Sequence, residues 1–133
     1  MLTLFLVFTA LNHALPQTIW NGPSITFTKG NHADWKLEEN QDRITENVWI
    51  TRADSRALFN IKNESEAGLA GLSFNDVPSD TEWAYGTTDS YDTLTYSNLN
   101  TLIGNNFKNI ADGQNRVLHL ISDDIYIDIK FLS

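Results

Sequence analysis

The stretch that decides the fold is Val117-Leu118-His119-Leu120-Ile121-Ser122-Asp123-Asp124-Ile125-Tyr126-Ile127-Asp128-Ile129-Lys130-Phe131. Two apolar-rich runs flank a polar Ser-Asp-Asp turn, and this pattern predicts a β-hairpin. In the second run the apolar residues alternate with Tyr126, Asp128 and Lys130. One face of the hairpin is therefore expected in the core and the other in solvent.

Shorter runs of the same kind precede the hairpin. They predict strands over 24–29, 48–52, 58–61, 82–87 and 93–97, a long loop over 63–80, and a short helix near 99–103 that ends at Gly104. About seven short strands with frequent turn signals favour an all-β fold, a two-sheet antiparallel sandwich or a jelly roll. The chain stops at Ser133, directly after the last strand, so we expect the module over 18–133 to be truncated at its C-terminus.

Composition narrows the possible partners. The chain has 133 residues, a net charge of −8 and no cysteine. An acidic surface repels phosphate backbones, so a nucleic-acid partner is not expected. Without cysteine, disulfide frameworks and thiolate metal sites are excluded.

Residues 1–14 predict an imperfect signal peptide. The apolar run from Leu2 to Leu11 is too short to span a membrane as a helix, but it fits the central region of a secretory leader. No Lys or Arg precedes this run, and Asn12 occupies the −3 position for cleavage after Ala14. The alternative is a buried N-terminal strand or helix. We expect a secreted or cell-surface protein without a membrane span.

Catalytic signatures are weak. His119 lies within a predicted strand, where a partly covered sheet histidine is the plain interpretation, and no Gly-x-Ser-x-Gly accompanies it. A carboxylate pair could hydrolyse a glycosidic bond, and the candidates are Asp42, Glu46, Glu82, Asp123, Asp124 and Asp128. Because the chain has 17 acidic residues, the sequence offers many possible carboxylate pairs and does not show which of them lie close together. We expect a protein that is not an enzyme.

Aromatic residues supply the candidate ligand-binding site. Trp35 and Trp83 flank polar loops and are expected at the surface, together with Tyr85, Asp42 and Arg43. Flat aromatic faces beside polar side chains suit sugar rings. The same aromatic residues could instead fill the core.

Calcium is a weaker possibility. Asp34 and Asp42 lie in one predicted loop, and Asp123 and Asp124 lie at the hairpin turn. Calcium takes six to eight oxygen ligands, but no EF-hand loop is present. The alternative is that these residues form turns through local hydrogen bonds.

Several phrases of the sequence resemble a known module. They are Ile25-Thr26-Phe27-Thr28-Lys29, Ala33-Asp34-Trp35, Glu39-Asn40-Gln41-Asp42-Arg43-Ile44-Thr45, Asn47-Val48-Trp49-Ile50-Thr51-Arg52, Thr81-Glu82-Trp83-Ala84 and the run from Leu118 to Phe131. Together they resemble an uncharacterised β-rich module of large secreted or cell-surface bacterial proteins of the Bacteroidetes type, which often carry a type IX sorting domain. The resemblance covers the chain from about Trp20 onward.

The resemblance implies export and a β-rich module, and it carries over no catalytic residues. We therefore expect an extracellular noncatalytic adhesion or carbohydrate-binding module with a glycan or cell-surface partner. The alternatives are a fragment of a glycosidase-like hydrolase and a structural spacer.

Overall fold

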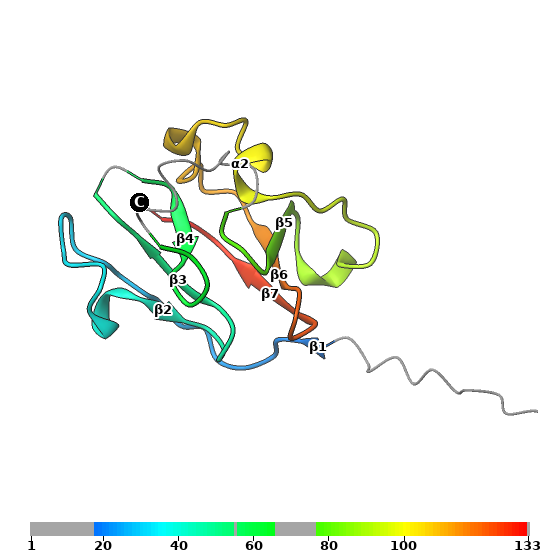
Figure 1. The fold of residues 1–133 in the computed structure, drawn as a ribbon. Helices are drawn as coiled ribbons and strands as arrows, with labels where there is room; N and C mark the ends of the chain where they lie inside the picture. The colour runs from blue at the N-terminus through cyan, green and yellow to red at the C-terminus, as the bar shows by residue number, and fades with distance from the viewer. Residues whose placement is uncertain (1–17, 55, 66–76, 133) are drawn as a thin grey trace, which may run out of the picture.

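The computed structural model describes residues 18–54, 56–65 and 77–132. Their strands form two sheets, one of four strands in the order β1-β7-β6-β5 and one of three strands in the order β2-β3-β4 (Figure 1). The bounds are β1 Thr18–Ile19, β2 Asp42–Arg43, β3 Trp49–Arg52, β4 Leu58–Asn60, β5 Thr81–Tyr85, β6 Arg116–Leu120 and β7 Ile125–Ile129. The predicted all-β, two-sheet fold is confirmed, with one parallel pairing, between β1 and β7.

The hairpin forms as predicted. Strands β6 and β7 pair antiparallel, with Leu118 opposite Ile127 and Leu120 opposite Ile125. Strand β5 pairs with the other side of β6 and places Trp83 opposite Leu118. Because side chains alternate along a strand, these residues share one face, which is directed at the second sheet.

The main core lies between the sheets. Ile50 lies in β3, and Val48 directly precedes that strand. Both pack in one cluster with Trp83, Leu118 and Leu120 of the first sheet. Helix α2 (Leu99–Leu102) adds Leu99 to this cluster and lies beside the sheets in Figure 1. Sandwich packing of this kind buries one face of each sheet.

The other face of the first sheet is covered in part. Asp128 and Lys130 are exposed, as predicted, but the prediction for Tyr126 is wrong. Tyr126, expected in solvent, is only 6% exposed and contacts the rings of Tyr91 and Tyr96. Those two tyrosines follow the 3-10 turn η3 (Thr88–Ser90). Thr88 fastens this turn to β7, since its backbone N and hydroxyl both donate to Asp128, at 2.7 and 2.8 Å.

The predicted short helix is confirmed as α2. Asn98 accepts a hydrogen bond from the backbone N of Thr101 at 2.8 Å, the usual N-cap contact. Gly104 follows the helix with a φ of +68°, a left-handed conformation that glycine adopts without strain. A further 3-10 turn, η4 (Phe107–Asn109), leads on towards β6.

Two predicted strands do not form. Residues 24–29 are not in a strand and are mostly exposed, Ile25 by 79%. Alternation alone does not make a strand when no neighbouring strand supplies hydrogen bonds. Residues 93–97 are turn and loop, apart from a single bridge of Ser97 to Trp83, because this segment folds over the covered face of the sheet.

Some elements of the structure were not predicted, and some predicted segments lie outside the described residues. The strand prediction missed β1 and β2, and a 3-10 turn, η1 (Glu38–Asn40), precedes β2. The proposed leader, 1–14, and most of the predicted loop 63–80 lie outside the described residues. Among the helices of the described ranges, none has the length and apolar character required to cross a membrane.

Candidate functional site

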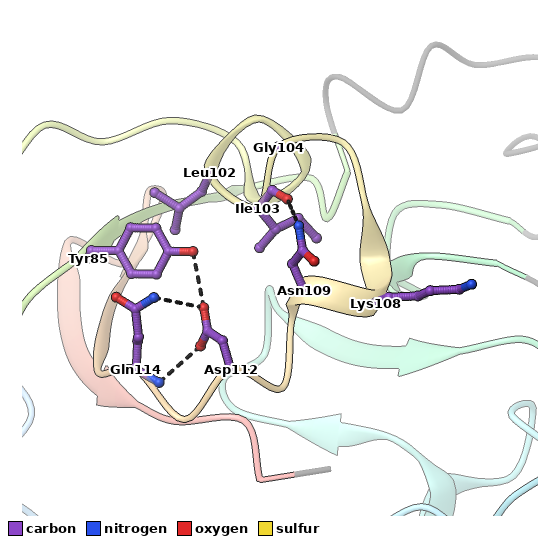
Figure 2. Close-up of a pocket in the computed structure, with 8 residues that line it drawn as sticks. All are labelled: Tyr85, Leu102, Ile103, Gly104, Lys108, Asn109, Asp112 and Gln114. Atoms are coloured by element: carbon purple, nitrogen blue, oxygen red, sulfur yellow. Dashed lines mark hydrogen bonds between the residues drawn. The ribbon is translucent and has the colours of Figure 1, made fainter.

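An open groove lies between the end of β5, helix α2 and the turn that precedes β6 (Figure 2). Its volume is about 560 Å³, within the range of small-molecule sites. It is lined by Tyr85, Leu102, Ile103, Gly104, Lys108, Asn109, Asp112 and Gln114. The groove therefore combines one aromatic ring, an aliphatic wall and several polar groups.

The fold brings these side chains together from three separate segments. Tyr85 is the last residue of β5, and Asn109 ends the turn η4. Asp112 and Gln114 lie on either side of Gly113, whose φ of +72° allows the tight turn into β6. Loop ends of a sandwich are where such sites are usually built, because the sheets beneath them are rigid.

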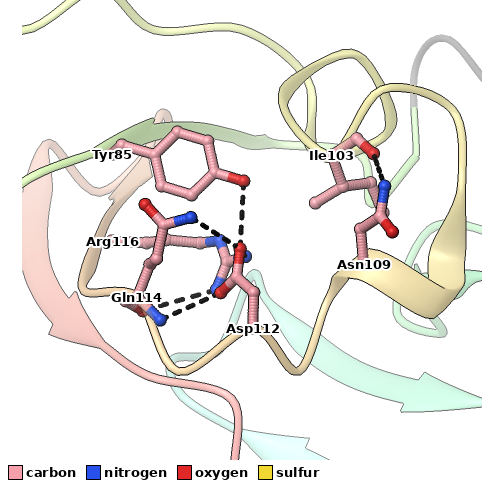
Figure 3. Close-up of polar contacts among 6 residues, drawn as sticks. All are labelled: Tyr85, Ile103, Asn109, Asp112, Gln114 and Arg116. Carbon is pink, nitrogen blue, oxygen red and sulfur yellow. Dashed lines mark hydrogen bonds and ion pairs between the residues drawn. The ribbon is translucent and has the colours of Figure 1, made fainter.

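Asp112 organises the polar side of the groove (Figure 3). It accepts hydrogen bonds from the backbone N of Gln114 at 2.9 Å and from that residue's amide nitrogen at 3.2 Å. The Tyr85 hydroxyl donates to it at 3.3 Å, and the Arg116 guanidinium donates at 2.9 Å. The backbone N of Gln114, followed by the positive charge and the hydrogen bond of Arg116, lowers the pKa of Asp112.

Arg116 supports the groove from beneath. Its side chain is fully buried, and its guanidinium lies 5.0 Å from the centre of the Tyr85 ring and 5.4 Å from that of Phe131. Arg116 and Tyr85 are directly opposite each other on paired strands, so the stacking follows from the sheet register. Asp112 is the charge partner of this buried cation. Among the described residues, none accepts a hydrogen bond from the Nε of Arg116.

The Tyr85 ring is both fixed and accessible. Arg116 covers one ring face and Asp112 holds the hydroxyl, yet Tyr85 remains 36% exposed. Because Arg116 is buried, the exposed surface of the ring belongs to its edge and opposite face. Figure 2 shows the ring at the groove wall with its hydroxyl directed inward. A pre-oriented aromatic face loses little conformational entropy when a ligand packs on it.

A second polar cluster lies on the covered face of the same sheet. His119 contacts Glu82 through Nδ1 at 2.7 Å and Asp124 through Nε2 at 3.1 Å. Its ring is stacked on that of Tyr126, with centroids 4.0 Å apart and planes 3° apart. The expectation of a partly covered sheet histidine is confirmed, since His119 is 9% exposed.

Both ring nitrogens of His119 contact carboxylate oxygens, Nδ1 that of Glu82 and Nε2 that of Asp124. The side chains of Glu82 and Asp124 are 37% and 39% exposed, and the imidazole occupies the space between them.

The two predicted surface tryptophans are not in the groove. Trp83 is 1% exposed and packs against Phe131 in the core, so the prediction of an exposed ligand-binding Trp83 is wrong. It lies on the inner face of β5, and its indole N donates to Thr81. Trp35 is half-buried and packs edge-on against Phe59 at 5.7 Å, in a smaller apolar cluster.

Asp42 and Arg43 form strand β2 and lie apart from Tyr85, on the other sheet. Arg43 is placed over the ring of Trp49 at 4.1 Å and pairs with Glu38 at 2.9 Å. Burial raises the pKa of Asp42. Of the predicted ligand-binding residues, Tyr85 alone lines the groove.

The four aspartates proposed for calcium do not converge. Asp34 accepts from the backbone N of Lys36, and Asp123 accepts from Thr45 and Asn47 at 2.6 and 2.8 Å. Asp124 is engaged with His119. Across the described ranges, no three His, Asp or Glu side chains gather closely enough to hold a metal ion. For Asp34 the turn-forming alternative explains the contact, whereas Asp123 binds side chains that are distant in sequence.

Sequence reasoning missed the polar half of the groove. In the sequence, an ordinary turn is all that is indicated by Asp112-Gly113-Gln114, and the strand that follows begins at Arg116. One signal was available, since a charged residue at the start of an apolar strand needs a partner, and an Asp four residues earlier can supply it.

Comparison with protein-family models, with curated proteins and with solved structures finds no match.

Proposed function

We propose that the protein is an extracellular noncatalytic module for adhesion or carbohydrate binding, and that the groove beside Tyr85 receives the ligand. The observation that carries the proposal is the exposed Tyr85 ring, held between Arg116 and Asp112 at the edge of an open polar groove. A sugar offers C–H patches for an aromatic face and hydroxyls for the surrounding polar groups. Gln114 and Asn109 supply such groups here.

Export and a bacterial cell-surface setting are proposed on the resemblance and on the leader-like residues 1–14. A module that recognises or attaches to surface glycans is consistent with both. The acidic surface, with a net charge of −8, favours neutral or cationic partners over nucleic acid.

The hydrolase alternative gains less support from the site. Among the candidate carboxylates, Glu82 and Asp124 both contact His119. A glycosidase pair needs open space for the sugar and a water or nucleophile. With the imidazole between these two carboxylates, binding is better supported than hydrolysis.

A glycan array with the full chain and two variants tests the proposal. Tyr85→Ala should weaken binding of any positive glycan at least about tenfold, because it removes the ring at the groove wall. Trp20→Ala is the matched control, since Trp20 is also an exposed aromatic residue, 48% exposed, but lies outside the groove lining. Absence of binding to every glycan, or equal loss in both variants, would contradict the proposal.

A further inference from the structure

The groove has few free hydrogen-bond donors and several free acceptors. Asp112 accepts four hydrogen bonds, three of them at Oδ2 and only one, from the backbone N of Gln114, at Oδ1. Its charge is balanced by Arg116. Asp112 therefore keeps one acceptor position open at Oδ1, while its charge is paired with that of Arg116.

The contacts around Asp112 determine how its neighbours face the groove. The Tyr85 hydroxyl donates its hydrogen bond to Asp112, so towards a ligand its oxygen can act only as an acceptor. The Gln114 amide nitrogen also donates to Asp112, which turns the amide oxygen the other way. The Asn109 amide nitrogen donates to the carbonyl of Ile103 at 3.2 Å, which fixes its orientation in the same manner. Both amide orientations are visible in Figure 2.

Three oxygen acceptors result, on Tyr85, Gln114 and Asn109, and no described residue donates to any of them. The remaining donors are the second amide protons and the ammonium of Lys108. Figure 2 shows the Lys108 side chain directed away from Tyr85 and Asp112. The lining of the groove thus offers oxygen acceptors to a ligand that donates hydrogen bonds.

From this surplus of acceptors we infer that the groove selects neutral, hydroxyl-bearing saccharides over acidic ones. The inference rests on the proposed function and specifies its ligand class. A hydroxyl group donates and accepts, so it satisfies oxygen acceptors at a groove wall. A carboxylate or sulfate only accepts, and beside these oxygens it would lose water without gaining donors, which is costly. The preference for neutral over acidic sugars therefore has two sources. Neutral sugars gain favourable contacts, and acidic sugars make unfavourable ones.

The test is a set of matched oligosaccharides, hexose tetrasaccharides and the corresponding uronic-acid tetrasaccharides with the same linkages, measured by titration calorimetry. The neutral member of each bound pair should bind at least about tenfold more tightly, at constant ionic strength. Lys108→Ala should widen this difference, because it removes the one cation of the lining.

Tyr85→Phe separates the role of the hydroxyl oxygen from that of the ring. It should weaken binding of the neutral member by roughly two- to tenfold, the typical net contribution of one hydrogen bond, and should narrow the difference between the pair. Uronic acids that bind as tightly as the neutral sugars would overturn the inference and leave the proposed function intact. Failure of both kinds of sugar to bind would overturn the proposed function and the inference with it.

Discussion

Arg116 is the residue on which the groove depends most. Its guanidinium is buried between the rings of Tyr85 and Phe131, and its charge is balanced by Asp112. A buried cation with one charge partner is retained only where the geometry of the pair is good, because desolvation of the two ions costs much of what their attraction provides. The same pair also orients two groove residues, Tyr85 and Gln114.

Replacing Arg116 by Met keeps an apolar stem beneath Tyr85 but removes the partner of Asp112. The single variant should therefore be less stable than the wild type, by urea denaturation. Adding Asp112→Asn should restore part of the loss, because the uncompensated carboxylate is then absent. A double-mutant cycle measures this coupling, and additive effects of the two substitutions would contradict the assigned role of the pair.

Several element-level features could be predicted from local pattern. The hairpin β6–β7 was predictable because apolar residues alternate over its whole length, and α2 because Asn98 and Gly104 mark its ends. Trp83 could have been placed in the core by the same alternation, since it lies on the opposite face of its strand from the charged residue Glu82. The failed strand over 24–29 has the right alternation but no neighbour to pair with, which a local pattern does not reveal.

His119 joins three elements through side chains, and its replacement tests that link. His119→Phe keeps a ring to stack on Tyr126 but removes both contacts to carboxylates, leaving Glu82 and Asp124 with no group between them to donate a hydrogen bond. The free energy of unfolding should fall by about 1–2 kcal/mol. Ile121→Ala, at an exposed neighbouring position, should change it by no more than about 0.5 kcal/mol. Equal stability of the two variants in chemical denaturation would contradict this role.

At the scale of the whole molecule, the tyrosines on the second face of the larger sheet predict that the stability of the fold depends on pH. Burial raises the pKa of Tyr96 from 10.0 to about 12, and the negative groups around it, Tyr126, Glu82, Asp92 and Tyr91, act in the same direction. Burial also raises the pKa of Tyr126. The folded state thus favours neutral phenols on this face.

The sign of the effect follows from linkage. A group with a raised pKa in the folded state contributes stability that is complete below its unfolded value, here 10.0 for Tyr96, and is lost as the pH rises towards about 12. The urea midpoint should therefore fall between pH 10 and pH 12. Tyr96→Phe should flatten this fall, because no phenol is then left to ionise at that position. An unchanged slope in the variant would show that other groups control the alkaline transition.

The global arrangement also explains why the site was only partly predictable. Tyr85 was found because it is one of the aromatic residues that suit a sugar ring, and the structure places it at the end of β5. Asp112 and Gln114 were not found, because their role depends on a turn meeting the end of a strand that lies distant in sequence. Trp35 and Asp42 were chosen from loop polarity, and the fold places both on the smaller-sheet side of the molecule.

The most direct test of the central claim is a nuclear magnetic resonance titration of the full chain with a neutral oligosaccharide found on the array. We predict that the largest shifts in amide signals fall at Tyr85, Asn109 and Gln114, with small shifts on strand β2 and at Trp35. Shifts concentrated at Trp35 and Arg43, with the groove signals unchanged, would contradict the assignment of the groove as the ligand site.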